Sequence, residues 1–104
     1  MIREIPGDLL EDIRADNNIT WSDDTTDRNL RNQIGSGMAY LDGKLGEPGD
    51  YLRDGLPRTL LFEYVRYARS GALDAFEANY LSMILAMQTE RQVQRYAEKN
   101  PVSP

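Results

Sequence analysis

The chain has 104 residues, 40% of them hydrophobic and 28% charged, which predicts one folded domain over residues 1–104 and excludes a disordered chain. It contains neither cysteine nor histidine, which excludes disulfides, thiolate metal sites and histidine-dependent catalysis. The net charge is −5, and residues 1–27 hold eight acids against two bases, so tight binding to nucleic-acid phosphates is not expected.

Residues 8–16 are predicted to form the first helix. Pro6 suits an opening turn, and the acids that follow it complement the positive end of the helix dipole. The apolar face of this helix consists of Leu9, Leu10 and Ile13. Residues 17–24 are rich in capping and turn residues, so the helix should end near Asp16.

A second helix is predicted to begin after a cap at Asp24 or Thr25. Its apolar residues recur with the helical period of about 3.6, at Leu30, Ile34, Met38, Leu41 and Leu45. Residues 35–37 read Gly-Ser-Gly, which predicts either tight packing against another helix or a kink. Residues 43–55 are rich in glycine and proline and predict a loop, with a short turn at residues 50–53.

A third helix is predicted to open at Pro57 and to end at Ser70 and Gly71. Its broad apolar face consists of Leu60, Leu61, Tyr64, Val65 and Ala68. Phe62 falls away from that face on a helical wheel. We therefore expect Phe62 to be available for contact with another subunit.

Three arginines surround Phe62 within about 40° on the wheel: Arg58, Arg66 and Arg69. An aromatic side chain among guanidinium groups suits an acidic partner surface, such as the N-terminal quarter of an identical neighbour. The alternative is a half-covered Phe62 beside arginines that pair locally with Glu63 or Asp54.

The fourth helix is predicted to run from about residue 72 to about residue 98, which is about 40 Å at about 1.5 Å per residue. A compact domain of this size has a radius of gyration of about 13 Å, so the helix should protrude or lie across a neighbour. A tail is expected from about residue 99, since Asn100-Pro101 ends the helix.

The fourth helix also carries more apolar surface than one core needs. Its predicted core stripe is Leu73, Phe76, Tyr80, Ile84 and Met87. Leu81 and Leu85 fall outside this stripe, and Tyr96 lies on a narrow seam beyond Gln88, so we expect these three residues in a subunit or partner interface. The alternative is that the other helices wrap the first half while the rest frays.

The sequence offers little for catalysis or metal binding. Oxygen-bearing side chains alternate as in a calcium loop at Asp16, Asn18, Thr20, Ser22 and Asp27. Trp21 stands where that loop requires glycine, so a capped turn explains these residues better. Trp21 itself is expected to be either a lid on the core or an interface anchor. We predict that the protein is not an enzyme and binds no metal or cofactor.

Three stretches resemble the head-tail connector proteins of tailed phages, a small helical family also described as a DNA-packaging family. They are residues 9–16 with the acidic turn 23–27 and the helix from Leu30 to Gly46, then residues 60–68, then residues 72–80. The Gln-Leu-Arg-Gly tetrad from which the family takes a name is absent from this chain. The resemblance leaves the subfamily open.

The resemblance implies a subunit of a closed ring beneath the portal protein, with the twelve-fold symmetry of the portal. Such a ring extends the DNA channel and receives the tail or stopper protein, while genomic DNA passes without tight or sequence-specific binding. It implies location at the head-tail interface of the virion, and in the bacterial cytoplasm during assembly.

The sequence therefore predicts an all-α fold, a bundle of about four helices with a long C-terminal helix. No segment approaches the roughly 20 apolar residues that a membrane helix needs. One alternative function is a helix-turn-helix DNA-binding regulator built from the second and third helices, although their connection exceeds the usual turn of about three or four residues. Another is an adaptor for a different cellular protein.

Overall fold

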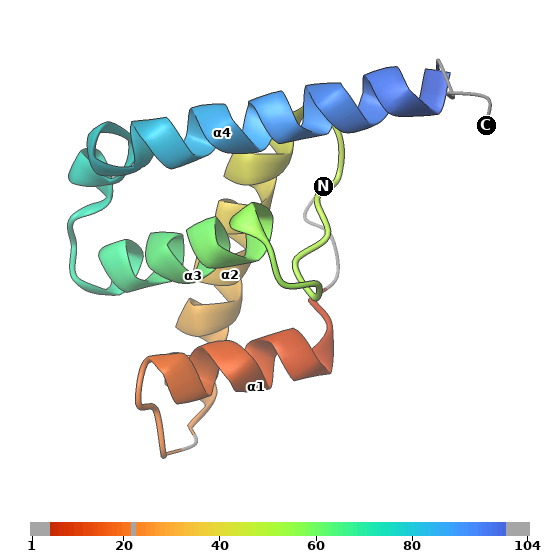
Figure 1. Ribbon diagram of the computed structural model, residues 1–104. Coiled ribbons are helices and arrows are strands. Elements are labelled where there is room, and N and C mark those ends of the chain that lie inside the picture. The colour runs from red at the N-terminus through yellow and green to blue at the C-terminus, as the bar shows by residue number, and fades with distance from the viewer. Residues whose placement is uncertain (1–4, 22, 100–104) are drawn as a thin grey trace.

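The computed structural model describes residues 5–21 and 23–99, and within these ranges it contains helices, turns and loops but no strand. The four helices are α1 (Gly7–Asp16), α2 (Asp24–Leu45), α3 (Leu56–Arg69) and α4 (Leu73–Lys99). The prediction of an all-α bundle with a long C-terminal helix is confirmed (Figure 1). The predicted helix stop at Asn100-Pro101 lies outside the described residues.

The helices form an elongated molecule. α3 and α4 lie next to each other and run antiparallel, α1 lies beyond α3, and α2 crosses all three (Figure 1). The radius of gyration is 15.2 Å and the extents are 54 × 29 × 25 Å. A compact domain of this length would have a radius of gyration of about 13 Å. The excess arises because α4 reaches past the other helices (Figure 1).

The ends of α2 differ from the sequence prediction. Asp23 is the N-cap, and its carboxylate accepts a hydrogen bond of 2.7 Å from the backbone N–H of Thr26. The predicted cap at Asp24 or Thr25 is therefore wrong, because Asp23 is the last residue with extended backbone angles. At the other end α2 continues through Gly43 to Leu45, and Gly46 caps it with φ of 76°. The loop is accordingly shorter than predicted.

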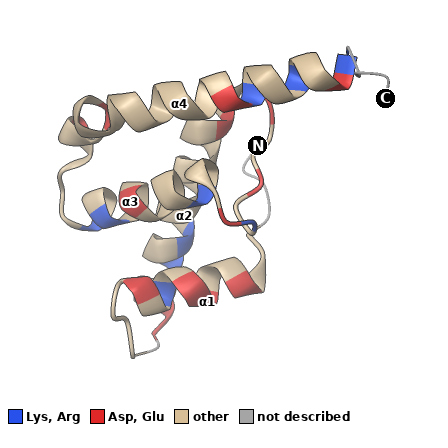
Figure 2. Ribbon diagram, in the orientation of Figure 1, with Lys and Arg blue, Asp and Glu red and all other residues tan. Residues whose placement is uncertain are grey.

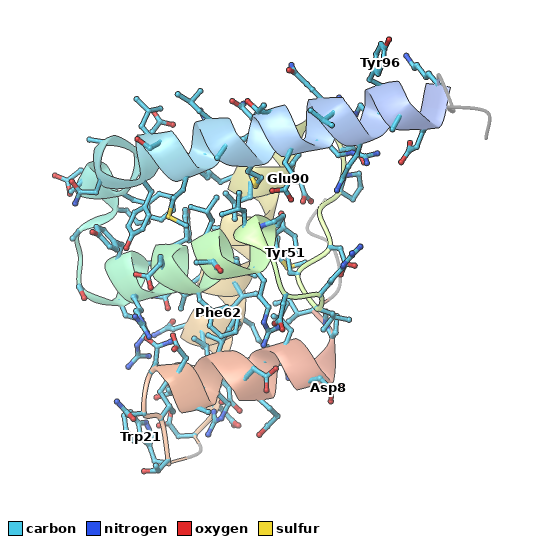
Figure 3. All side chains as sticks on the ribbon, viewed as in Figure 1. Asp8, Trp21, Tyr51, Phe62, Glu90 and Tyr96 are labelled. Atoms are coloured by element: carbon cyan, nitrogen blue, oxygen red, sulfur yellow. The ribbon has the colours of Figure 1, made fainter. Side chains whose placement is uncertain are left out.

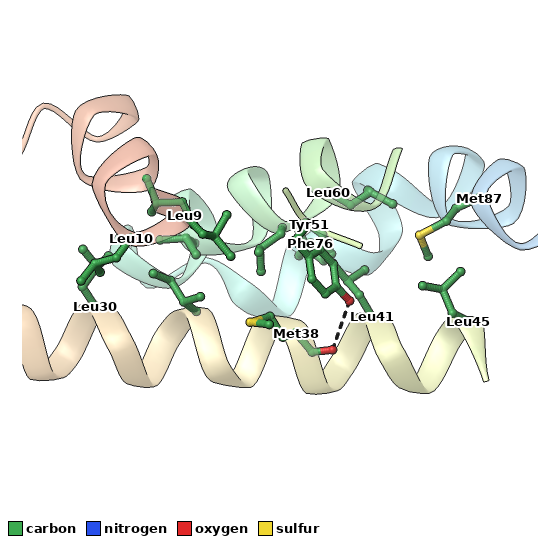
Figure 4. Packing of buried hydrophobic residues seen from close by; sticks show 14 of the residues in the cluster. Leu9, Leu10, Leu30, Met38, Leu41, Leu45, Tyr51, Leu60, Phe76 and Met87 are labelled. Carbon is green, nitrogen blue, oxygen red and sulfur yellow. Dashed lines mark hydrogen bonds between the residues drawn. The ribbon is translucent and has the colours of Figure 1, made fainter. Parts of the chain in front are cut away.

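One buried cluster joins all four helices and the loop that follows α2 (Figure 4). The predicted stripe of α2 is entirely buried, which confirms its helical periodicity. In α4, Phe76, Ile84 and Met87 are buried, but Leu73 is 40% exposed. Its assignment to the core was wrong, because Leu73 is the first residue of the helix and lies at the edge of the packed region.

Two features fix how α2 meets its neighbours. A Cβ atom on Gly37 would lie 2.7 Å from Cδ1 of Leu61 and 2.8 Å from Cδ1 of Tyr64. The tight packing predicted from the Gly-Ser-Gly stretch is thus confirmed at Gly37, where α3 approaches closely. The loop residue Tyr51 is also buried, and its hydroxyl donates a hydrogen bond of 2.6 Å to Asp42.

The loop between α2 and α3 contains the turn that the sequence predicts at residues 50–53. The carboxylate of Asp50 accepts hydrogen bonds from the backbone N–H groups of Leu52 and Arg53.

In the described part of the chain, no helix is long and apolar enough to cross a membrane.

Candidate subunit interface

The Phe62 patch, defined as Arg58, Phe62, Arg66 and Arg69, lies on α3. Phe62 is half-buried and packs against the core, so it is less free than the helical wheel predicted. The Arg58 guanidinium lies 4.6 Å from the centre of its ring. Arg58 also forms an ion pair of 2.8 Å with Asp12 of α1.

Arg66 makes a second connection between α3 and α1. Its guanidinium lies 2.6 Å from the carboxylate of Asp16 and 3.0 Å from that of Glu63. The hydrogen bond with Asp16 raises the pKa of Arg66. The acids that we expected from a neighbouring subunit are therefore supplied to Arg58 and Arg66 by α1 of the same chain.

The structure also contains the local ion pairs of the alternative interpretation. Arg66 pairs with Glu63, and Arg58 lies 3.8 Å from Asp54. Arg69 is exposed, and no ion pair of Arg69 is formed within the described residues. A role of the Phe62 patch in subunit contact stays a prediction, with Arg69 as its available cation.

Trp21 lies at the opposite end of the molecule from Tyr96 (Figure 3). Its side chain is 50% exposed, and its indole N–H donates a hydrogen bond of 3.2 Å to the hydroxyl of Thr26. Its backbone carbonyl accepts a hydrogen bond from Arg14. A half-exposed indole held in one place by the chain suits an anchor for a partner better than a lid on the core.

An uncharged exposed surface lies along α4, on the side away from its buried residues Phe76, Ile84 and Met87. We define this outer face as Ala78, Leu81, Ser82, Leu85, Ala86, Thr89, Gln92, Val93 and Tyr96, all of which are exposed. Leu81 is 49% exposed and Leu85 52%. The outer face therefore contains three of the residues that the sequence predicted for an interface, since Tyr96 belongs to it as well.

Contacts of the second half of α4 were not predicted from the sequence. Arg91 and Arg95 both form ion pairs with Glu47, at 2.8 and 2.6 Å, and their hydrogen bonds lower its pKa. Arg95 also donates to the backbone carbonyl of Leu45. The signal was available, because Arg91 and Arg95 continue the helical spacing of the buried Met87.

The described residues contain no group of three or more acids placed to hold a metal ion. Asp16 and Asp27, two residues of the calcium-like pattern, pair instead with Arg66 and Arg14. Ser22 of the same pattern lies outside the described residues. The arrangement serves to connect helices.

The connections between helices also bear on DNA binding. Residues 46–55 separate α2 from α3, more than the turn of about three or four residues in a helix-turn-helix. Residues 70–72 do form a short turn, but α3 and α4 run antiparallel (Figure 1), unlike the two crossed helices of that motif.

Comparisons with protein-family models, with curated proteins and with solved structures found no match to this chain.

Proposed function

We propose that this protein is a structural subunit that binds other protein subunits, and that it forms the head-tail connector ring of a tailed phage. In this role it docks beneath the portal protein, extends the DNA channel and receives the tail or stopper protein. The ring is a dodecamer that matches the portal. The protein acts in the virion, and during assembly in the cytoplasm of the bacterial host.

The observation that carries the proposal is the exposed outer face of α4. Leu81 and Leu85 lie about half exposed on a helix that already buries Phe76, Ile84 and Met87 on its opposite side. Contiguous exposed apolar surface of this kind marks protein interaction sites. It supports a protein-binding role, and the resemblance of three stretches, which cover most of residues 8–80, to connector proteins supports the specific one.

A ring imposes a second requirement, because each subunit must present two different complementary surfaces. Trp21 and α4 lie on opposite sides of the molecule (Figure 3). This placement suits head-to-tail contact, in which α4 of one subunit meets the Trp21 end of the next. The net charge of −5 is also suitable for a DNA conduit, since it repels the cargo.

The test combines genome context with assembly. The gene is expected to lie beside genes for a portal and a major capsid protein. The purified protein is expected to form rings on that portal, observed by electron microscopy and by light scattering coupled to size exclusion. Leu81→Asp should abolish the rings, whereas Leu52→Asp, at a similarly exposed leucine outside α4, should not.

The absence of a neighbouring portal gene, or of any ring on the purified portal, would overturn the connector function. Specific binding of a different cellular protein through the outer face would then favour the adaptor alternative.

A further inference from the structure

The charges of α4 are distributed unusually for an exposed helix face. A solvated helix normally places charged residues opposite the core. Here the charged residues between the two ends of the helix lie at least about 100° from the centre of the outer face, at about 100° per residue. They are Glu77, Glu90, Arg91, Arg95 and Glu98. The outer face is therefore uncharged for about 27 Å, from Ala78 to Tyr96, at about 1.5 Å per residue.

The ends of this uncharged stretch carry opposite charges. Asp74 precedes it and Lys99 follows it, on the same side of the wheel. Both side chains are exposed, and neither forms an ion pair within the described part of the chain. An antiparallel copy of α4 would place Lys99 beside Asp74 at both ends, and would also set the positive end of each helix dipole against the negative end of the other.

The outer face is complementary to itself in that arrangement. When two copies are aligned antiparallel about residue 87, Ala78 faces Tyr96, so a small residue meets the largest one of the face. The same register places Leu81 opposite Val93 and Leu85 opposite Thr89. Because the face is complementary to its own antiparallel copy, it suits an isologous two-fold contact.

We propose that the outer face of α4 binds the same face of a second copy of this chain, with the two helices antiparallel and centred on residue 87. The position of α4 permits this contact, since the helix forms one edge of the molecule and the other three helices lie on the side opposite the outer face (Figure 1). Two copies can thus bring their α4 helices together without a clash between their bodies.

The pair uses the face that the ring also needs, so pairing holds subunits back from ring closure until a docking partner competes for α4. The pairing itself does not depend on the connector function. If the protein forms pairs but no ring on the portal, the pairing proposal stands and the connector function is overturned. If it forms rings but never pairs, the connector function stands and the pairing proposal is overturned.

Cysteine substitutions test the orientation directly, because the chain has no cysteine of its own. Ala78→Cys and Tyr96→Cys proteins are mixed and treated with a short bismaleimide. The mixture is expected to give a covalent dimer. Each variant alone should not, since the thiols of two identical copies in the antiparallel pair would lie about 27 Å apart along the helices. A dimer from Ala78→Cys alone, or no dimer in the mixture, would overturn the proposal.

Association in solution gives a second test. In analytical ultracentrifugation the wild type is expected to show a reversible monomer–dimer equilibrium, and Leu85→Glu to weaken it by at least about tenfold, which corresponds to about 1.4 kcal/mol. Leu52→Glu is the matched control, because Leu52 is 54% exposed against 52% for Leu85. A wild-type monomer at every concentration, or equal effects of the two variants, would overturn the proposal.

The charged ends give a third test at low salt. Asp74→Lys or Lys99→Asp should weaken pairing when either variant is alone, since like charges then meet at each end. Mixing the two variants should restore pairing to the wild-type level, because every altered end meets an opposite charge. No recovery on mixing would overturn the antiparallel register.

Discussion

The two halves of α4 are held to the body of the protein in different ways. In the first half, the ring of Phe76 is 2% exposed and lies within 6.0 Å of four tyrosine rings, measured between centroids: Tyr40, Tyr64, Tyr67 and Tyr80. In the second half, polar contacts replace apolar ones. Arg91 and Arg95 pair with Glu47, and Gln88 donates to the carbonyl of Lys44.

The difference shows how one helix can serve both the core and an assembly surface. Apolar contacts in the first half contribute to the stability of the whole fold. Partly exposed ion pairs in the second half are weaker and are screened by salt. The second half should therefore open locally without unfolding the rest. The following predictions test this contrast.

The largest effect is expected from Phe76→Ala in the first half. Removal of a fully buried aromatic ring should lower the free energy of unfolding by about 3–5 kcal/mol, because the surrounding tyrosines cannot fill the space. Urea unfolding measures this loss. Leu85→Ala on the outer face of the same helix is the control, and in dilute solution it should change stability by less than about 0.5 kcal/mol. Equal losses would show that the outer face is also core.

A smaller effect is expected where α2 packs closely against α3, the helix that lies next to the first half of α4. Gly37→Leu would insert a side chain where even a Cβ atom lies 2.7 Å from Leu61, so we expect a loss of about 1–3 kcal/mol. Gly43→Leu is the matched control on the same helix, since nothing lies within 4 Å of its Cβ position. It should be neutral or slightly stabilising by helix propensity. A neutral Gly37→Leu would contradict the tight contact.

Much of the core that the first half of α4 packs against could be predicted from the sequence. The stripe from Leu30 to Leu45 repeats at helical spacing, and Gly37 indicates close packing, because both signals are local to one helix. Tyr51 could not be placed in the core, since it lies in a loop and its burial depends on the hydroxyl contact with Asp42. Leu73 was misplaced because a helical wheel gives direction but not how far the neighbouring helices reach.

The candidate interface was predicted in part. The wheel correctly placed Leu81 and Leu85 outside the core, because exposure on a long helix follows from its periodicity. It did not reveal that Arg58 and Arg66 pair with α1, since those pairs join residues far apart in the sequence. Beyond Gln88, where the sequence left fraying as an alternative, α4 continues as a helix to Lys99.

A local effect is expected from Glu47→Gln, which removes the shared partner of Arg91 and Arg95. Amide hydrogen exchange should accelerate at residues 91–97 while exchange near Ile84 changes little, because the apolar contacts of the first half remain. Glu90→Gln is the control, since Glu90 is on α4 but forms no ion pair within the described residues. Equal acceleration in both variants, or none in Glu47→Gln, would contradict the ion-pair anchor.

The smallest effect is a pH dependence confined to the second half. Hydrogen bonds from Arg91 and Arg95 lower the pKa of Glu47. A carboxyl group with a lowered pKa in the folded state stabilises that state above its ordinary pKa, and this stabilisation is lost as the pH falls through the lowered value. Protection of residues 91–97, corrected for the intrinsic exchange rate at each pH, should therefore hold at neutral pH and decrease in acid. Protection near Ile84 should decrease less.

The Glu47→Gln variant decides whether Glu47 is the group that binds the proton. Because glutamine does not titrate in this range, the variant should show low protection of residues 91–97 at neutral pH and little further loss in acid. Glu98 also pairs with Arg91, at 3.5 Å, and this ion pair is available in both proteins. If the wild type and the variant lost protection in parallel as the pH fell, the acid effect would come from Glu98 or another carboxyl group. The ion pairs of Glu47 would then not be what holds the second half of α4 in place.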